Sequence, residues 1–245
     1  MSDLLSLSAV LFIAFVVESA VGFGSALFVV ALGAQLVALD HLLPVFQPLS
    51  VLLSTTIVLR ERAHLDLPFL SRRVLPAMLP GVVVGMVIWR LWPGQALLLL
   101  VGPSIAGLAL IKLVDVVNDR VPAPLSPTVS NAVLALAGVL HGMFGTSGPP
   151  VVWVAARTLV DKARFRATLS LLWLALSAIL VVGYAIDGSL NTTTLGESVL
   201  LLPALVVGYV VGNVLHHRVP QRAFGIGVCL MLIASGLALT LRAVG

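Results

Sequence analysis

Charged residues are scarce in this sequence. They make up 10% of its 245 residues, while hydrophobic residues make up 60%, and a soluble domain usually carries about 25% charged residues. The mean hydropathy is +1.14, so a soluble fold would have too little polar surface to cover its apolar side chains. A bilayer core of about 30 Å is crossed by about 20 apolar residues. The composition therefore predicts an all-α, polytopic membrane protein.

The sequence also has almost no cysteine and lacks the common catalytic motifs. The single cysteine, Cys229, excludes an intrachain disulfide framework and a cysteine-cluster metal site. The sequence has no P-loop, no HExxH and no GxSxG, which leaves nucleotide hydrolysis and the common hydrolase reactions without support. We expect no metal and no cofactor. The net charge of +4 comes from residues between apolar blocks, without interleaved aromatics, so we expect membrane anchoring and no nucleic-acid partner.

Eight apolar blocks follow one another along the chain, separated by short polar connections. Two of them are too long for one ordinary span and are broken by glycine-rich segments, Gly22-Phe23-Gly24-Ser25 in the first and 142–150 in the fifth. Each broken block has the pattern of two half-helices that form a re-entrant hairpin. The blocks span residues 4–39, 42–59, 74–91, 96–117, 129–160, 169–186, 199–215 and 223–241.

The two halves of the chain resemble each other at an offset of about 121 to 127 residues. Phe23-Gly24-Ser25 then meets Phe144-Gly145-Thr146, and Asp40 meets Asp161. The segment Leu79-Pro80 likewise meets Leu202-Pro203, and Gly85 meets Gly208. This order predicts a duplication with a first repeat at 1–121 and a second at 122–245, together forming one membrane domain. Internal repeats of this kind are common in secondary transporters.

The distribution of Lys and Arg predicts the orientation of the repeats. If each broken block enters and leaves on the same side, 12 of the 14 Lys and Arg residues are cytoplasmic, and only Arg90 and Arg242 are outside. Single crossings would divide the same residues 7 to 7, so the positive-inside rule favours hairpins. Each half then has three full crossings, which inverts the second repeat relative to the first. Both termini are predicted to lie outside.

The two breaks are the candidate substrate site. Unwound backbone at membrane depth is tolerated only inside protein or beside water, and half-helix N-termini direct N–H groups toward an anion. We expect the two tips to meet near the middle of the membrane. The alternative is that the glycines only allow close helix packing. The predicted substrate-binding residues are Gly22, Phe23, Gly24, Ser25, Gln47, Gly145, Thr146, Ser147 and Gly148.

Two ionisable residues lie one helical turn before the breaks. Glu18 precedes Gly22, and His141 precedes Gly145. Ionisable groups inside a membrane are costly and usually functional, so both are candidates for proton coupling, and His has an unperturbed pKa of about 6.5. A structural hydrogen-bonding role for either residue, or an aqueous vestibule around Glu18, is the alternative.

With its paired breaks and its duplicated Leu-Pro-X-X-X-X-Gly segments at Leu79 and Leu202, the chain resembles the TauE/SafE family of sulfite exporters over nearly its whole length. The resemblance implies transport, usually export, of sulfite, sulfoacetate or similar small anions without ATP. The first break has Ser25 and Ala26 where the family often has glycines. This departure affects the expected substrate more than the expected fold.

We therefore expect a secondary carrier that exports a small sulfur-containing or organic anion with proton coupling. The motivation is a pair of facing helix N-termini without a buried Lys or Arg. A passive anion channel is the alternative, and an intramembrane enzyme using Ser25 or Ser147 with His141 is a weaker one. The expected partners are the anion, protons and the lipid of a bacterial cytoplasmic membrane, with a homodimer as an open possibility.

Overall fold

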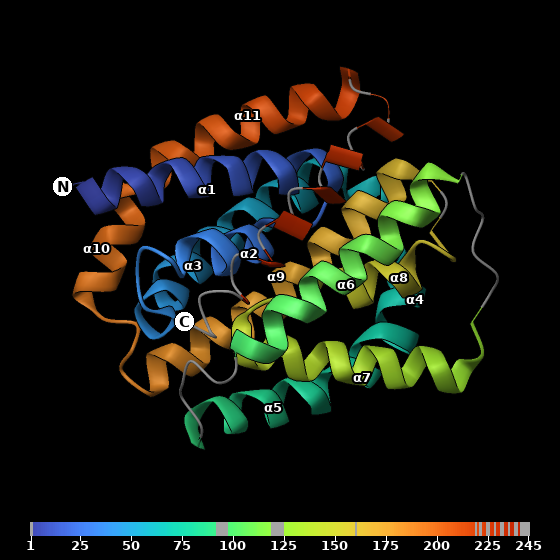
Figure 1. Ribbon diagram of the computed structural model, residues 1–245, viewed down its shortest axis with the longest axis horizontal. Coiled ribbons are helices and arrows are strands. Elements are labelled where there is room, and N and C mark those ends of the chain that lie inside the picture. The colour runs from blue at the N-terminus through green and yellow to red at the C-terminus, as the bar shows by residue number, and fades with distance from the viewer. Residues whose placement is uncertain are drawn as a thin grey trace.

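The computed structural model describes residues 2–91, 98–118, 125–159 and 161–218, and isolated positions between 220 and 240. The predicted repeat boundary at 121–122, Arg242 and much of the last apolar block lie outside these residues. Within the described part every regular element is helical, which confirms the predicted all-α class (Figure 1). The elements are α1 (Ser2–Val21), α2 (Ser25–Phe28) with a π-helical continuation (Val29–Gly33), α3 (Leu39–Glu61), a 3₁₀ turn (Arg62–His64), α4 (Leu67–Phe69), a π-helical segment (Leu70–Val74), α5 (Leu75–Leu91), α6 (Leu98–Val117), α7 (Pro127–Phe144), α8 (Gly148–Ala155), α9 (Lys162–Ile186), α10 (Thr192–Leu200) and α11 (Leu202–Arg218).

Several helices have the length and composition of membrane spans. Five qualify among the described residues: α1, α3, the α4 to α5 segment, α7 and α9, with α10 and α11 as a sixth when the bent pair is counted as one. The bend of 43° falls just before Pro203, whose ring excludes the preceding helical hydrogen bond. Large apolar side chains stay exposed on several helices, including part of α9, as lipid contact requires. They include Val83, Val84, Val87, Val182, Ile186, Val199, Val206 and Val210.

Two pairs of parallel helices pack closely through glycine. On α11, Gly208 lies against Phe12 and Phe15 of α1, and Gly212 lies against Val16. On α5, Gly85 lies against Val139 and Gly142 of α7. Because a glycine has no Cβ, the two backbones of each pair approach one another directly, as small residues permit in membranes.

Replacing Gly85 by leucine should destabilise the fold. An added Cβ would lie 3.0 Å from the carbonyl carbon of Val139 and 3.1 Å from Cα of Gly142, so α5 and α7 would have to separate. Overpacking costs about 1–3 kcal/mol, which corresponds to a melting temperature lower by roughly 3–10 °C in detergent. Gly107→Leu on α6 is the control, because a Cβ there meets nothing within 4 Å. Equal melting temperatures for the two variants would show that close packing at Gly85 is unimportant.

The centre of the bundle is the antiparallel pair α3 and α9. Ser50 Oγ lies 3.3 Å from Ser177 Oγ, and farther along the same pair Glu61 Oε1 lies 3.2 Å from Arg166 Nη1. The bundle therefore has two distinct ends. We call one the Arg90 end, which holds Asp40, His41, Arg90, Asp187 and Glu197, and the other the Arg166 end, which holds Glu61, Asp66, Lys162, Arg164 and Arg166.

Corresponding landmarks of the two halves recur 123 residues apart. Gly22 and Gly145 end α1 and α7, Gly24 and Ser147 precede α2 and α8, and Ala38 and Asp161 precede α3 and α9. The predicted match of Gly24 with Gly145 is therefore shifted by two residues, because Gly22 is the glycine that terminates α1. Figure 1 shows α1 and α7 running in opposite directions along the bundle. Inversion across a membrane stays a prediction.

In each broken block, the helix before the break and the helix after it differ in length; we call them the first and second limb. We expected two half-helices in each block, but α1 has 20 residues and α7 has 18, and both are long enough to cross a bilayer. Only the second limb is short, since α2 with its π continuation covers Ser25–Gly33 and α8 covers Gly148–Ala155. The first limbs are longer because each helix continues until a glycine stops it.

Candidate functional site

Both breaks are made by glycines with left-handed backbone. Gly22 has φ +88°, Gly24 has φ +113° and Gly145 has φ +64°, a region that other residues rarely adopt. Gly22 donates its N–H to the Glu18 carbonyl at 2.6 Å, and Gly145 donates to the His141 carbonyl at 2.7 Å. These bonds are glycine C-caps, so each long helix ends one turn after its ionisable residue.

The two breaks line one cavity inside the bundle. Its volume is about 20 Å³, which is room for about one water molecule, and Ser50 places it close to the middle of α3. The lining residues are Glu18, Gly24, Ser25, Ala26, Leu27, Ser50, His141, Gly145, Thr146, Ser147, Gly148, Trp173 and Ser177. The structure thus brings most of the predicted residues of both breaks together, along with Glu18 and His141.

Three buried side chains carry polar atoms without a hydrogen-bond partner; two of them line this cavity, and the third, Gln47, packs against its lining residue Gly145. They are both amide atoms of Gln47, Nε2 of His141 and Oγ1 of Thr146. Gln47 is fully buried, and its Nε2 occupies the place that a Cβ on Gly145 would take. An unsatisfied buried polar group costs about 1–3 kcal/mol, so a cluster of them at a cavity indicates a site for a polar guest.

The Glu18 carboxylate accepts a hydrogen bond from the first break. One of its carboxylate oxygens accepts a hydrogen bond from the Ser25 hydroxyl, and the other accepts from Ser54 Oγ at 3.4 Å. Ser25 begins α2, so an acidic group of the protein already occupies the start of this short helix. A second negative charge at the same place would be repelled while Glu18 is ionised.

Trp173 connects the two breaks and was missed in the sequence analysis. Its Nε1 donates to the Gly22 carbonyl at 2.8 Å, and its ring stacks on His141 with centroids 6.3 Å apart. His141 Nδ1 in turn lies 3.2 Å from Ser147 Oγ. Ser50 and Ser177, whose hydroxyl oxygens lie 3.3 Å apart, were not predicted either.

Three predicted substrate-binding residues do not line the cavity: Gln47, which packs against its lining residue Gly145, and, from the first break, Gly22 and Phe23. Gly22 faces α9, where a Cβ would lie 2.8 Å from Cα of Arg166. Phe23 packs in an edge-to-face contact with Phe165, with centroids 6.4 Å apart, and belongs to an apolar cluster with α5, α7 and α9. Gly22 and Phe23 therefore pack against neighbouring helices and take no part in lining the cavity.

The expectation that no Lys or Arg is buried is wrong. Arg166, assigned from the sequence to a cytoplasmic loop, is 1% exposed. It lies inside α9 because the helix begins at Lys162, where the Asp161 side chain accepts a hydrogen bond from the Arg164 N–H at 2.8 Å. The apolar block begins only at residue 169, which is why the sequence placed Arg166 outside the helix.

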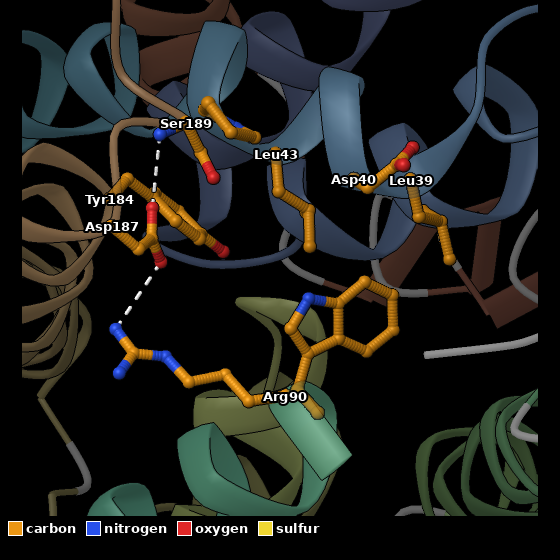
Figure 2. Close-up of a pocket in the computed structure, with 9 residues that line it drawn as sticks. Leu39, Asp40, Leu43, Arg90, Tyr184, Asp187 and Ser189 are labelled. Carbon is orange, nitrogen blue, oxygen red and sulfur yellow. Dashed lines mark hydrogen bonds and ion pairs between the residues drawn. The ribbon is translucent and has the colours of Figure 1, made fainter. Parts of the chain in front are cut away.

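A larger cavity opens at the Arg90 end (Figure 2). Its volume is about 350 Å³, and the side chain of Arg90 extends along it to Asp187, with 3.3 Å between Nη2 and Oδ2. The cavity is lined by Leu39, Asp40, Leu43, Pro44, Trp89, Arg90, Tyr184, Asp187 and Ser189. We call it the outer vestibule, because it lies nearer the end of the bundle than the central cavity does.

The outer vestibule and the central cavity share two helices. Leu43 of the vestibule lies one turn before Gln47 on α3, and Tyr184 lies two turns after Ser177 on α9. Gln47 and Leu180 are the side chains nearest to a Cβ placed on Gly145, and along α3 and α9 they lie between the lining residues of the two cavities. We call Gly145, Gln47 and Leu180 the wall.

The described residues contain no cluster of three or more His, Cys, Asp or Glu that could hold a metal ion. Their chemistry is that of hydrogen-bond donors around a small buried cavity, set between broken helices in a multi-span bundle. Broken helices that meet around a central site are typical of membrane transporters.

The comparison with known proteins gives the family. The family model described as Sulfite exporter TauE/SafE matches residues 7–239, so the chain belongs to this family of membrane transporters. The chain is 30% identical over 177 residues to the probable inner membrane transporter protein TsaS of Comamonas testosteroni, covering 69% of this chain and 72% of that protein. It is 27% identical over 140 residues to the probable sulfite/organosulfonate exporter TauE of Cupriavidus necator, covering 56% and 54%. No solved structure matches.

Proposed function

We propose that this protein is a secondary carrier that exports a small sulfur-containing anion, such as sulfite or sulfoacetate, bound in the central cavity. The observation that carries the proposal is the set of partnerless buried groups of Gln47, His141 and Thr146 around the second break. Amide, hydroxyl and imidazole N–H groups are the donors that an oxyanion accepts from. The N-terminus of α8 adds a partial positive charge at the same place.

The central cavity has to widen before it holds such an anion. At about 20 Å³ it accommodates roughly one water molecule, whereas sulfite has four heavy atoms. This closed state fits a carrier that opens its site to one side at a time. The outer vestibule is the proposed exit, separated from the site by the wall of Gly145, Gln47 and Leu180.

We propose that Glu18 couples proton binding to anion binding. Its ionised carboxylate holds the Ser25 and Ser54 hydroxyls and would repel an anion at the same break. A proton on Glu18 removes that charge, so the anion and the proton bind together. Because a divalent anion with one proton still carries a net negative charge, a negative cell interior drives the pair outward. His141 then acts as a donor: when Ser147 Oγ donates to Nδ1, the ring proton lies on Nε2, the nitrogen without a partner.

The proposed setting is a bacterial inner membrane, with two inverted repeats and both termini outside. The name of the Comamonas testosteroni relative as an inner membrane transporter supports the location. The sorting of charge supports the orientation, since Arg90 lies at one end and Lys162, Arg164 and Arg166 lie at the other. A homodimer is an open part of the proposal, to be tested by measuring the oligomeric state of the purified protein.

The test is a flux assay with the purified protein in liposomes. We expect saturable flux of sulfite and sulfoacetate, weaker flux of sulfate, and a response to an imposed pH gradient. Gln47→Leu should raise the KM about tenfold, because one charge-assisted hydrogen bond contributes about 1.5–3 kcal/mol. Flux that neither saturates nor responds to pH would indicate a channel. No anion flux above that of empty liposomes would contradict the carrier.

A further inference from the structure

Arg166 is the largest fully buried side chain among the described residues. It lies in the second turn of α9 and takes no part in lining the central cavity. A buried guanidinium is expensive unless its charge and its donors are met. Its partners therefore indicate what this position is built to bind.

The contacts of Arg166 leave part of its fork unused. Nη1 lies 3.2 Å from Glu61 Oε1, and Nη2 donates to Asn213 Oδ1 at 3.1 Å. Neither Nε nor Nη1 has a hydrogen-bond partner, so the contact of Nη1 with Glu61 is an ion pair only, and the second carboxylate oxygen of Glu61 also has no partner. Arg166 and Glu61 thus meet through one oxygen only, although a guanidinium and a carboxylate can pair through two parallel hydrogen bonds.

Glu61 is the more accessible member of the pair. Its side chain is 18% exposed, against 1% for Arg166. Glu61 ends α3, and the chain continues there into the short turn Arg62–His64. The carboxylate therefore lies between the surface of the Arg166 end and the buried guanidinium.

Arg166 also lies directly behind the first break. Its Cα is 2.8 Å from the position of a Cβ on Gly22. The Gly22 carbonyl accepts the hydrogen bond of Trp173, which lines the central cavity two turns farther along α9. A line of contacting residues thus leads from the Arg166 end to the central cavity, through Glu61, then Arg166, then the first break, and marks the route that an anion would take.

We propose that Arg166 is a second anion-binding residue on this route, and that Glu61 occupies it until a substrate anion takes its place. The proposal rests on the proposed function, because the anion is the transported one. An oxyanion with two or three oxygens can accept hydrogen bonds from Nε and Nη1 of Arg166 at the same time. Glu61 offers only one oxygen to the guanidinium and cannot do this. Exchange of one anion for another keeps the buried guanidinium paired throughout, so it avoids the cost of breaking a buried ion pair.

The test compares two carboxylate variants in the liposome assay, with sulfite presented to the Arg166 end. Glu61→Gln removes the competing charge, so the KM for sulfite should fall about tenfold, the effect of one charge-assisted hydrogen bond. Asp66→Asn is the matched control. Asp66 pairs at 3.7 Å with the exposed Arg164 at the same end. The KM of the Asp66→Asn variant for sulfite should stay unchanged.

Arg166→Lys complements this test by keeping the charge and removing the planar fork. We expect this variant to have a KM for sulfite about tenfold higher than the wild type. If Arg166→Lys fails to fold, the double variant Glu61→Gln with Arg166→Gln replaces it, because both members of the pair are then neutral. In that double variant the lower KM of Glu61→Gln should be lost. A KM for Glu61→Gln that is unchanged or higher, in a protein whose wild type transports sulfite, would overturn the role of Arg166. Absence of flux in the wild type would instead contradict the proposed function.

Discussion

Gly145→Leu is expected to abolish anion transport while leaving the protein folded in detergent. Gly145 has φ +64°, and a side chain there would occupy the place of the Gln47 amide and approach Leu180, whose Cδ1 lies 3.6 Å from the Cβ position. The Gln47 donor would be displaced and the wall to the outer vestibule would be fixed in place. Misplacing one positioned group can cost about 100-fold in rate, so sulfite flux should fall by about that factor or more.

Gly188→Leu is the matched control for this variant. Gly188 also has a positive φ, +79°, but a Cβ there meets nothing within 4 Å. Both substitutions carry the backbone strain of a left-handed residue, about 1–2 kcal/mol, and only Gly145→Leu disturbs the cavity. Comparing melting temperature and sulfite flux separates strain from function. Flux in Gly145→Leu equal to that in Gly188→Leu would show that the second break has no part in transport.

Glu18→Gln is expected to remove the response to a pH gradient while preserving downhill flux. Glutamine keeps one oxygen that accepts from Ser25, and its NH2 group can donate to Ser54 Oγ, but it does not ionise, so no proton accompanies the anion. In wild-type liposomes with the membrane potential clamped, sulfoacetate added on the acidic side should accumulate in the alkaline lumen. For one proton per anion the accumulation is about tenfold per pH unit. Glu18→Gln should bring the two sides only to equal concentration.

Glu197→Gln is the control for the loss of a carboxylate. Glu197 lies at the Arg90 end, where it pairs with His41 at 2.8 Å, and we expect wild-type accumulation in this variant. Accumulation of sulfoacetate on the acidic side of the wild type would contradict joint binding of anion and proton. Persistent accumulation in Glu18→Gln would transfer the coupling role to another group, with His141 the first to be tested.

The positions of the two breaks could be predicted because they depend on local chemistry. Only glycine adopts the left-handed backbone of Gly22, Gly24 and Gly145 without strain, so the sequence itself shows where the helices stop. The lengths of the limbs were not predictable in the same way. Hydropathy marks the apolar stretch, whereas a helix extends to its caps, which are Ser126 for α7 and Asp161 for α9.

The same difference explains why Arg166 was assigned to a loop. It belongs to a basic run that resembles a membrane anchor, and a cluster of charge next to an apolar block is normally solvent-exposed. Only the packing of α9 against Glu61 of α3 and Asn213 of α11 buries it. Trp173, Ser50 and Ser177 were missed for a related reason, since single residues in apolar helices carry no local signal.

The sequence by itself determined the class of protein, the family and the residues at which two helices are interrupted. Composition decides the solvent in which a chain is stable, and glycine decides where a helix can end, so neither depends on distant contacts. The tertiary structure alone decided which side chains share the central cavity, which polar atoms there lack partners, and that an arginine is buried behind the first break. These features depend on how α3 and α9 cross and on how α1 and α7 are positioned around them, and contacts between residues more than 100 positions apart are not encoded in any local pattern.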